Sequence, residues 1–316
     1  MAAIPMLSHA FFEGQIVPFG EAKVSIGTNT LQYGTGAFAG IRGYLDADGE
    51  TVNIFRLPDH SARLLRSAKL LRAELPFDRD SLAATIVALA ERNAPTGDIY
   101  IRPFVYKPGF DLTPKLRGMG DELAIYMLQM GDYLDTSKGV RAVVSSWKRI
   151  ADNAIPSRGK FTGAYVNSAF AKDEAEEKGG EEALLLNEQG KVAEGSGCNV
   201  FIVRDGVLTT PPISADILEG ITRRSFIRFA VDAGIPVEQR EIDRSEVYLA
   251  DEAFFCGTGV QVSPIIAIDG RPIGEGVMGP ITSRLRDIFF DTVRGRNDRY
   301  AEWLTPVRQA VPVAAG

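Results

Sequence analysis

The chain has 316 residues, enough for two domains that each bury an apolar core. Acidic residues outnumber basic ones by 41 to 35, and the net charge of −6 argues against nucleic acid or an anionic membrane as a partner. The only cysteines are Cys198 and Cys256 and the only histidines His9 and His60, which excludes a disulfide framework and a histidine-rich metal site. With no signal-peptide pattern and no long apolar run, we expect a cytoplasmic protein that binds no metal.

The first half of the chain is predicted to form a small α/β domain over residues 1–130. Its expected elements, in chain order, are a hairpin over 10–17, helices over 57–72 and 80–93, and strands over 99–106 and 122–129. Residues 107–120 are rich in glycine, proline and basic residues, which predicts a long loop between the last two strands. Turn residues and charge over 131–139 predict the interdomain linker.

The second half is predicted to form a larger domain over residues 140–316. Its expected elements are a strand over 140–147, a loop over 149–162, a helix over 163–178, strands over 183–187, 191–194 and 199–203, a helix over 221–232, strands over 253–256 and 264–268, and a helix over 280–293. Strands and helices are mixed without strict alternation, which favours an α+β fold over a doubly wound sheet.

Several polar residues of the second half together match the requirements of pyridoxal 5′-phosphate (PLP). The cofactor needs an amine for a Schiff base, an acid beside its pyridine nitrogen, a donor to its ring oxygen, and free N–H groups for its phosphate. The candidates, in that order, are Lys160, Glu194, Tyr165, and the helix start at Ile221 and Thr222 with the glycine turn at Thr258 and Gly259. Each residue taken singly has an ordinary structural explanation, so the prediction depends on the set.

The motifs around these residues resemble those of class IV aminotransferases. They are KFTGAYVN at 160–167, VAEGSGCNVF at 192–201, LEGITR at 218–223, YLADE at 248–252 and GT at 257–258. In the first half, YGTGAFAGIR at 33–42 and YIRP at 100–103 resemble the branched-chain amino-acid aminotransferase subgroup. The similarity covers nearly the whole chain, with its motifs in order.

The resemblance implies a fold type IV PLP enzyme, with a small α/β domain and a larger mixed-sheet or pseudo-barrel domain. It implies transamination of leucine, isoleucine and valine with 2-oxoglutarate, and a homodimer or higher homo-oligomer. Lys160 would be the catalytic lysine, and the other cofactor-binding residues would be Arg63, Tyr165, Glu194, Leu218, Gly220, Ile221, Thr222 and Thr258. The substrate-binding residues would be Tyr33, Phe38, Tyr100, Arg102, Met130, Tyr133, Thr258 and Gly259.

The sequence departs from the family pattern beside the cofactor and the pocket. Phe161, Thr162 and Ala164 replace the small residues and the asparagine usual after the lysine, and Cys198 stands where a glutamate is common. These changes bear on the substrate range more than on the chemistry. A D-amino-acid or (R)-amine transaminase on the same fold remains one alternative, and a non-catalytic PLP-binding homologue is another.

Overall fold

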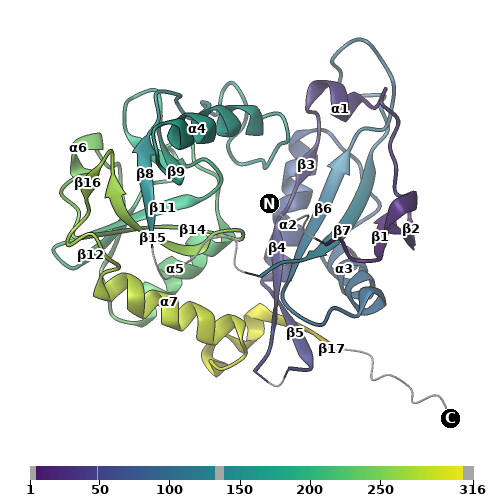
Figure 1. The fold of residues 1–316 in the computed structure, drawn as a ribbon. Coiled ribbons are helices and arrows are strands. Elements are labelled where there is room, and N and C mark those ends of the chain that lie inside the picture. Colours follow the sequence, from purple (N-terminus) through teal and green to yellow (C-terminus); the bar gives the residue numbers. More distant parts are fainter. Residues whose placement is uncertain (1–4, 48, 132–138, 309–316) are drawn as a thin grey trace. The chain divides into compact units, whose positions relative to one another are not determined.

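The computed structural model describes residues 5–47, 49–131 and 139–308, which belong to two compact units. Unit 1 comprises Met1–Gly131, Gly159–Gly163 and Asp291–Gly316, and unit 2 comprises Asp132–Arg158 and Ala164–Phe290. Figure 1 shows the elements of each unit. This division differs from the expected boundaries, because residues 159–163 and the C-terminal strand hydrogen-bond to strands of unit 1. Most of the predicted 131–139 linker, at 132–138, lies outside the described residues.

Unit 1 contains an antiparallel sheet of eight strands in the order β17-β5-β4-β6-β7-β1-β2, with β3 paired to β6. The strands are β1 (His9–Phe12), β2 (Gln15–Pro18), β3 (Ala37–Phe38), β4 (Ile41–Leu45), β5 (Thr51–Phe55), β6 (Ile99–Tyr106), β7 (Glu122–Gln129) and β17 (Leu304–Arg308). The hairpin and the strands at 99–106 and 122–129 are as predicted. The long β6–β7 pair keeps register over its whole length, and it lies in the middle of the strand order of this sheet.

The helices of unit 1 begin where the sequence offers start signals. They are α1 (Asn29–Tyr33), α2 (Leu57–Leu70) and α3 (Arg79–Asn93), with short 3-10 turns at η1 (Phe19–Glu21) and η2 (Asp298–Trp303). Pro58 lies in the first turn of α2, and the Asp78 side chain caps α3 by accepting from the backbone of Asp80 and Ser81. The segment 107–120 contains no helix or strand, in agreement with the predicted loop.

Unit 2 contains a mixed sheet of nine strands in the order β10-β9-β8-β15-β14-β11-β12-β13, with β16 paired to β15. The strands are β8 (Val140–Val144), β9 (Glu182–Leu186), β10 (Val192–Gly195), β11 (Asn199–Arg204), β12 (Val207–Thr210), β13 (Val237–Gln239), β14 (Glu252–Gly257), β15 (Gln261–Ile268) and β16 (Arg271–Pro272). β8 runs parallel to both β9 and β15, while β14 is antiparallel to both of its neighbours.

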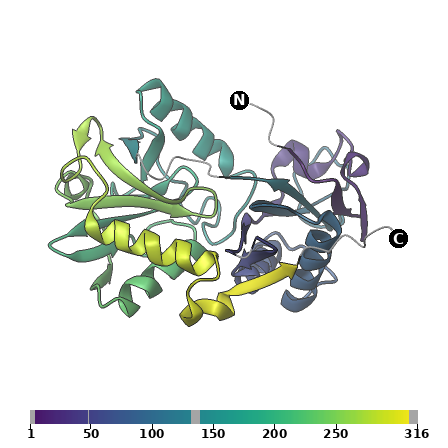
Figure 2. The ribbon, with the colours of Figure 1, turned by 60° about the horizontal axis from the view of Figure 1, so that its bottom comes forward.

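The helices of unit 2 are α4 (Tyr165–Glu177), α5 (Ile221–Asp232), α6 (Arg244–Val247) and α7 (Pro280–Val293). Phenylalanine rings bind α5 to both the sheet and α7: Phe226 lies 5.4 Å from Phe254 of β14 and 5.6 Å from Phe289 of α7, between ring centroids. Figure 2 shows α7, in yellow, beside the strands of this unit, where the N–H groups of Ile281 and Thr282 donate to Glu252 of β14. The mixture of helices with antiparallel and mixed sheets confirms the α+β class.

Among the described residues, none of the helices combines the length and the apolar character that a bilayer crossing requires.

Candidate active site

Lys160 lies on a short segment, Gly159–Gly163, that belongs to unit 1 and forms an isolated antiparallel bridge to β3 between Phe161 and Ala37. The Phe38 N–H donates to the Lys160 carbonyl at 3.0 Å, and the Lys160 N–H donates to Ser67 Oγ of α2 at 3.2 Å. The lysine Nζ lies 5.1 Å from the centroid of the Phe38 ring. The backbone of the candidate catalytic lysine is therefore fixed from two elements, with its amine beside an aromatic side chain.

Arg102 and Tyr100 project from the same face of β6, because they are two residues apart on a strand. The Arg102 guanidinium carbon lies 4.5 Å from the Phe38 ring centroid and 5.1 Å from that of Tyr100, and its Nη2 donates to the Tyr100 hydroxyl at 2.9 Å. Within the described part of the chain, Arg102 Nε is buried without a hydrogen-bond partner. A Cβ at position 40 would lie 2.1 Å from the Tyr100 hydroxyl oxygen, so Gly40 is needed to admit that hydroxyl. Unit 1 thus brings Lys160, Phe38, Tyr100 and Arg102 together.

Three further predicted residues of unit 1 occupy different positions. Tyr33, the last residue of α1, donates its hydroxyl to the Leu112 carbonyl at 2.6 Å, which ties the 107–120 loop to α1. Met130 follows β7, and its carbonyl accepts a hydrogen bond from Arg42 Nη2 at 2.9 Å. Arg63 is buried on α2. Tyr133 is the remaining candidate from the first half of the chain, and it lies outside the described residues.

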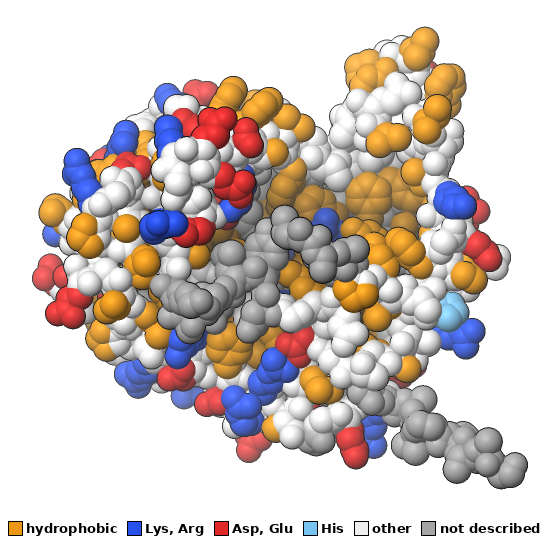
Figure 3. All heavy atoms as spheres, in the orientation of Figure 1, with side chains coloured by type: hydrophobic (Ala, Val, Ile, Leu, Met, Phe, Trp, Pro, Cys, Tyr) orange, Lys and Arg blue, Asp and Glu red, His pale blue; other side chains and the backbone are white. Residues whose placement is uncertain are grey.

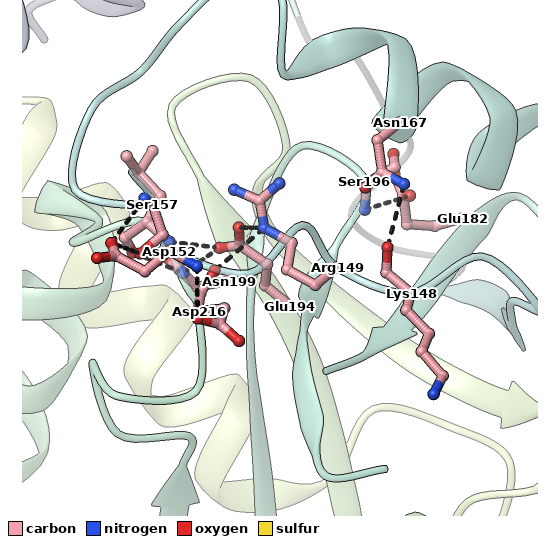
Figure 4. A network of polar contacts seen from close by, with 11 residues as sticks. Lys148, Arg149, Asp152, Ser157, Asn167, Glu182, Glu194, Ser196, Asn199 and Asp216 are labelled. Carbon is pink, nitrogen blue, oxygen red and sulfur yellow. Dashed lines mark hydrogen bonds and ion pairs between the residues drawn. The ribbon is translucent and has the colours of Figure 1, made fainter. Parts of the chain in front are cut away.

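Glu194, on β10 of unit 2, is a buried carboxylate with three close donors (Figure 4). Arg149 Nε lies 2.9 Å from Oε1, while Asn199 Nδ2 and the Leu218 N–H donate to Oε2 at 2.9 Å and 3.1 Å. A guanidinium at this distance and two donors favour the ionised carboxylate. The sequence analysis did not predict Arg149 and Asn199 as partners of Glu194. Asn199 lies within the motif at 192–201, but no spacing signal connects Arg149 to Glu194.

The N-terminus of α5 is built around a glycine. Gly220 is the N-cap, no described side chain caps the helix, and no acidic residue lies in the first turn. A Cβ at position 220 would lie 1.9 Å from Asn199 Oδ1, so only glycine fits. The first N–H groups of this helix, at Ile221 and Thr222, have no acceptor four residues back along it, which suits an anion such as phosphate.

The remaining predicted residues of unit 2 lie at the ends of elements. Tyr165 is the first residue of α4, and Thr258 and Gly259 form the turn between β14 and β15. Cys198 is buried in the apolar core of this unit, and that burial raises the pKa of its thiol well above the usual value. Among the residues that the structure describes, no group of histidine, cysteine and acidic side chains is arranged to hold a metal ion.

The polar groups of each unit match the chemical requirements of PLP. Unit 2 supplies a buried, multiply hydrogen-bonded carboxylate for a pyridinium and an uncapped helix start for a phosphate. Unit 1 supplies a backbone-anchored lysine amine and a buried arginine. These are the groups that PLP requires for covalent attachment, ring protonation and phosphate binding.

Comparison with known proteins identifies the family. The sequence model of the family described as "Amino-transferase class IV" matches residues 36–268, so the chain belongs to the class IV aminotransferases. It is 49% identical over 302 residues to the probable branched-chain-amino-acid aminotransferase of Aquifex aeolicus (strain VF5), covering 95% of this chain and 97% of that one.

Solved structures of relatives share the fold. The branched-chain aminotransferase of Thermoproteus uzoniensis with norvaline superposes with a TM-score of 0.90 at 43% identity, covering 96% of this chain and 99% of that one. The branched-chain amino acid aminotransferase of Thermobaculum terrenum in its PLP-form gives a TM-score of 0.92 at 40% identity, covering 96% of this chain and 99% of that one. The predicted family and the predicted fold type IV architecture are confirmed.

Proposed function

We propose that this chain is a PLP-dependent branched-chain amino-acid aminotransferase. It transfers the amino group of leucine, isoleucine or valine to 2-oxoglutarate and releases the branched-chain 2-oxo acid and L-glutamate. The names of the near full-length relatives agree with the activity predicted from the sequence. The observation that carries the proposal is that the Lys160 amine and the Arg102 guanidinium lie over the same ring, Phe38.

That arrangement suits both substrates of the reaction. An aromatic wall would accept the branched side chain of leucine, while the half-buried Arg102 guanidinium, whose Nε has no partner among the described residues, would bind the distal carboxylate of glutamate or 2-oxoglutarate. Tyr100, with Thr258 and Gly259, would bind the α-carboxylate. The side-chain pocket would be lined by Tyr33, Phe38, Met130 and Tyr133.

When bound, PLP supplies the electron sink that makes the substrate Cα–H acidic. Lys160 would attach the cofactor and its Nζ would remove and return the Cα proton. Glu194, fixed by Arg149, Asn199 and the Leu218 backbone, would keep a proton on the pyridine nitrogen.

The other cofactor contacts follow from the positions already described. Tyr165 would donate to the ring oxygen, and Leu218 would pack against the ring face. The phosphate would be held by Arg63, Gly220, Ile221, Thr222 and Thr258.

We infer that the chain works as a homodimer in the cytoplasm, where its two free cysteines stay reduced. The tip of unit 1 supports the first inference: Ile26, Phe110 and Leu112 are more than two-thirds exposed, and Figure 3 shows apolar side chains covering this tip. Large exposed apolar side chains grouped in this way favour burial against a second copy. Light scattering after gel filtration tests this, and a monomer at micromolar concentration would contradict it.

A donor screen tests the activity. Purified chain loaded with PLP is assayed with 2-oxoglutarate and either L-leucine, D-alanine or (R)-1-phenylethylamine, with Lys160→Ala as the inactive control. We expect glutamate formation with L-leucine and little with the other two donors. Reaction with only D-alanine or only the amine would transfer the assignment to those transaminases, and no reaction with any donor would favour a non-catalytic homologue.

A further inference from the structure

The segment that carries Lys160 is paired to a glycine-rich segment just before β3, within unit 1. The Thr162 N–H donates to the Gly36 carbonyl at 2.9 Å, and the Gly163 N–H donates to the Gly34 carbonyl at 3.1 Å. A Cβ at position 34 would lie 2.6 Å from the Gly163 Cα, so the two backbones approach as closely as glycine permits. Gly34 also has a φ of +65°, a second reason for glycine there.

The Thr162 hydroxyl adds side-chain contacts to this backbone pairing. Its Oγ1 donates towards the Gly34 carbonyl at 2.8 Å and the Gly36 carbonyl at 3.2 Å, and it accepts from the Gly36 N–H at 3.2 Å. One hydroxyl therefore contacts three polar backbone groups of Gly34 and Gly36, beside the close approach of the two backbones. An alanine or glycine, the kind of residue usual at this place in the family pattern, leaves only the backbone bonds.

The position of this hydroxyl links the reactive amine to the wall of the substrate pocket. Two residues before Thr162 the chain carries Lys160, and two residues after Gly36 it carries Phe38, whose ring lies 5.1 Å from the lysine Nζ. The Phe38 N–H to Lys160 carbonyl bond closes the same ladder at 3.0 Å. The bridge between Ala37 and Phe161 places Lys160 opposite Phe38, and a slip of one residue in this pairing would remove Lys160 from that position.

We propose that Thr162 is a positioning residue for Lys160: its hydroxyl fixes the register of the lysine segment against residues 34–38 and so holds the amine beside the pocket wall. The proposal rests on the proposed function, in which Lys160 moves the substrate proton. A small displacement of a proton-transferring group lowers the turnover rate while leaving substrate affinity nearly intact. Loss of the Thr162 hydroxyl should therefore lower kcat and leave KM nearly unchanged.

The test compares Thr162→Val, which keeps the shape and removes the hydroxyl, with Thr162→Ser, which keeps the hydroxyl. Thr85→Val is the matched control, since Thr85 also donates to a backbone carbonyl, that of Ser81 at 2.9 Å on α3. The first readout is amide hydrogen exchange of the peptide spanning 158–164 in the chain without cofactor. The second is kcat and KM for L-leucine in the loaded enzyme. The third is a pH titration of the same enzyme, which gives the pH at which the absorbance of the bound cofactor changes.

We expect Thr162→Val to speed exchange in the 158–164 peptide about tenfold, to lower kcat about tenfold with KM for leucine within twofold, and to shift the absorbance transition. Thr162→Ser and Thr85→Val should stay within twofold of the unmodified chain. The proposal is overturned if Thr162→Val matches Thr85→Val in exchange, or if kcat falls without faster exchange of the lysine segment. Because exchange is measured without cofactor, failure of the proposed function, seen as an inactive unmodified enzyme, is distinguishable from failure of this proposal.

Discussion

The environment of Glu194, on β10, suits the proposed role of this carboxylate as the partner of a cationic ring nitrogen. Its two oxygens accept from Arg149, Asn199 and the Leu218 backbone, and both Arg149 and Glu194 are nearly inaccessible to solvent. A buried carboxylate without such donors would become protonated and would no longer stabilise a pyridinium. In the proposed function, Arg149 would therefore position this carboxylate and keep it ionised.

Replacing Arg149 by methionine should leave the Glu194 charge buried without its partner. Loss of one member of a buried ion pair costs about 3–5 kcal/mol, so we expect the free energy of unfolding to fall by about 3 kcal/mol and PLP binding to weaken. Urea unfolding and equilibrium dialysis with PLP measure the two effects. Arg141→Met, which breaks the exposed pair with Glu181, is the control and should change the free energy of unfolding far less. Equal losses in the two variants would contradict the role given to Arg149.

Replacing Arg102 should affect the kinetics with the two substrates differently. Arg102→Leu removes the guanidinium beside Phe38 but keeps an apolar surface, so the half-reaction with L-leucine should change little. The KM for 2-oxoglutarate should rise about 10- to 100-fold, because a charge-assisted hydrogen bond to the distal carboxylate is lost. Single-turnover kinetics with leucine and steady-state kinetics with 2-oxoglutarate distinguish these effects. A proportionate loss with both substrates would refute the dual use of this pocket.

At the scale of elements, α4 is bound to the end of β8 by one acidic side chain. Glu174 accepts from Lys178 Nζ at 2.7 Å and from the Ser146 N–H at 2.8 Å, with the Ser145 hydroxyl also donating. The hydrogen bonds from Lys178 and Ser145 lower the pKa of the Glu174 carboxyl from 4.5 to about 2. A lowered folded-state pKa stabilises the fold above the unfolded value, and this contribution is lost as the pH falls from about 4.5 through 2.

Glu174→Gln should therefore destabilise the chain at pH 7 by about 1–2 kcal/mol, since it removes charge-assisted hydrogen bonds. The difference from the unmodified chain should shrink as the pH falls below 4.5, where the unfolded carboxyl is protonated. Urea midpoints measured from pH 7 down to pH 3, within the window between the two pKa values, test this. Glu177→Gln, an exposed change on the same helix, should have almost no effect at any pH. A constant difference across the pH range would show that Glu174 acts through packing alone.

The elements predicted best are those whose pattern is local. Leucine spacing placed α2 to within two residues, and the glycine stop at Gly234 marked the end of α5, because helix formation depends on neighbours in sequence. Strand β17 was missed, since it pairs with β5 from the opposite end of the chain and contains a proline. Such pairing depends on tertiary contacts that a single sequence does not display.

The residues of the candidate site likewise divide into those that a local sequence pattern indicates and those that only tertiary contacts reveal. Lys160 and Glu194 were predicted because their motifs resemble those of a family, and the structure gives each residue defined polar contacts. Arg149 was missed because its partner lies on a distant strand, and the Thr162 contacts were missed because they join segments far apart in sequence. Tertiary pairing, rather than local pattern, determines which polar groups meet.

At the scale of the whole molecule, the chain passes from unit 2 to unit 1 and back within a few residues. Gly159–Gly163 belongs to unit 1, whereas the residues on both sides of it belong to unit 2. Lys160, the proposed catalytic lysine, is thus carried by a short insertion that pairs with β3 of unit 1. This connectivity explains why the lysine segment needs both backbone and side-chain anchors.

The most direct test of the central claim is one turnover of the PLP-loaded chain with L-leucine in the absence of any 2-oxo acid. The branched-chain 2-oxo acid released is quantified for the unmodified chain and for Lys160→Ala. We predict about one equivalent of 4-methyl-2-oxopentanoate per chain from the unmodified protein and almost none from the variant. Absence of product from the unmodified chain, or equal release from the variant, would contradict an aminotransferase that works through Lys160.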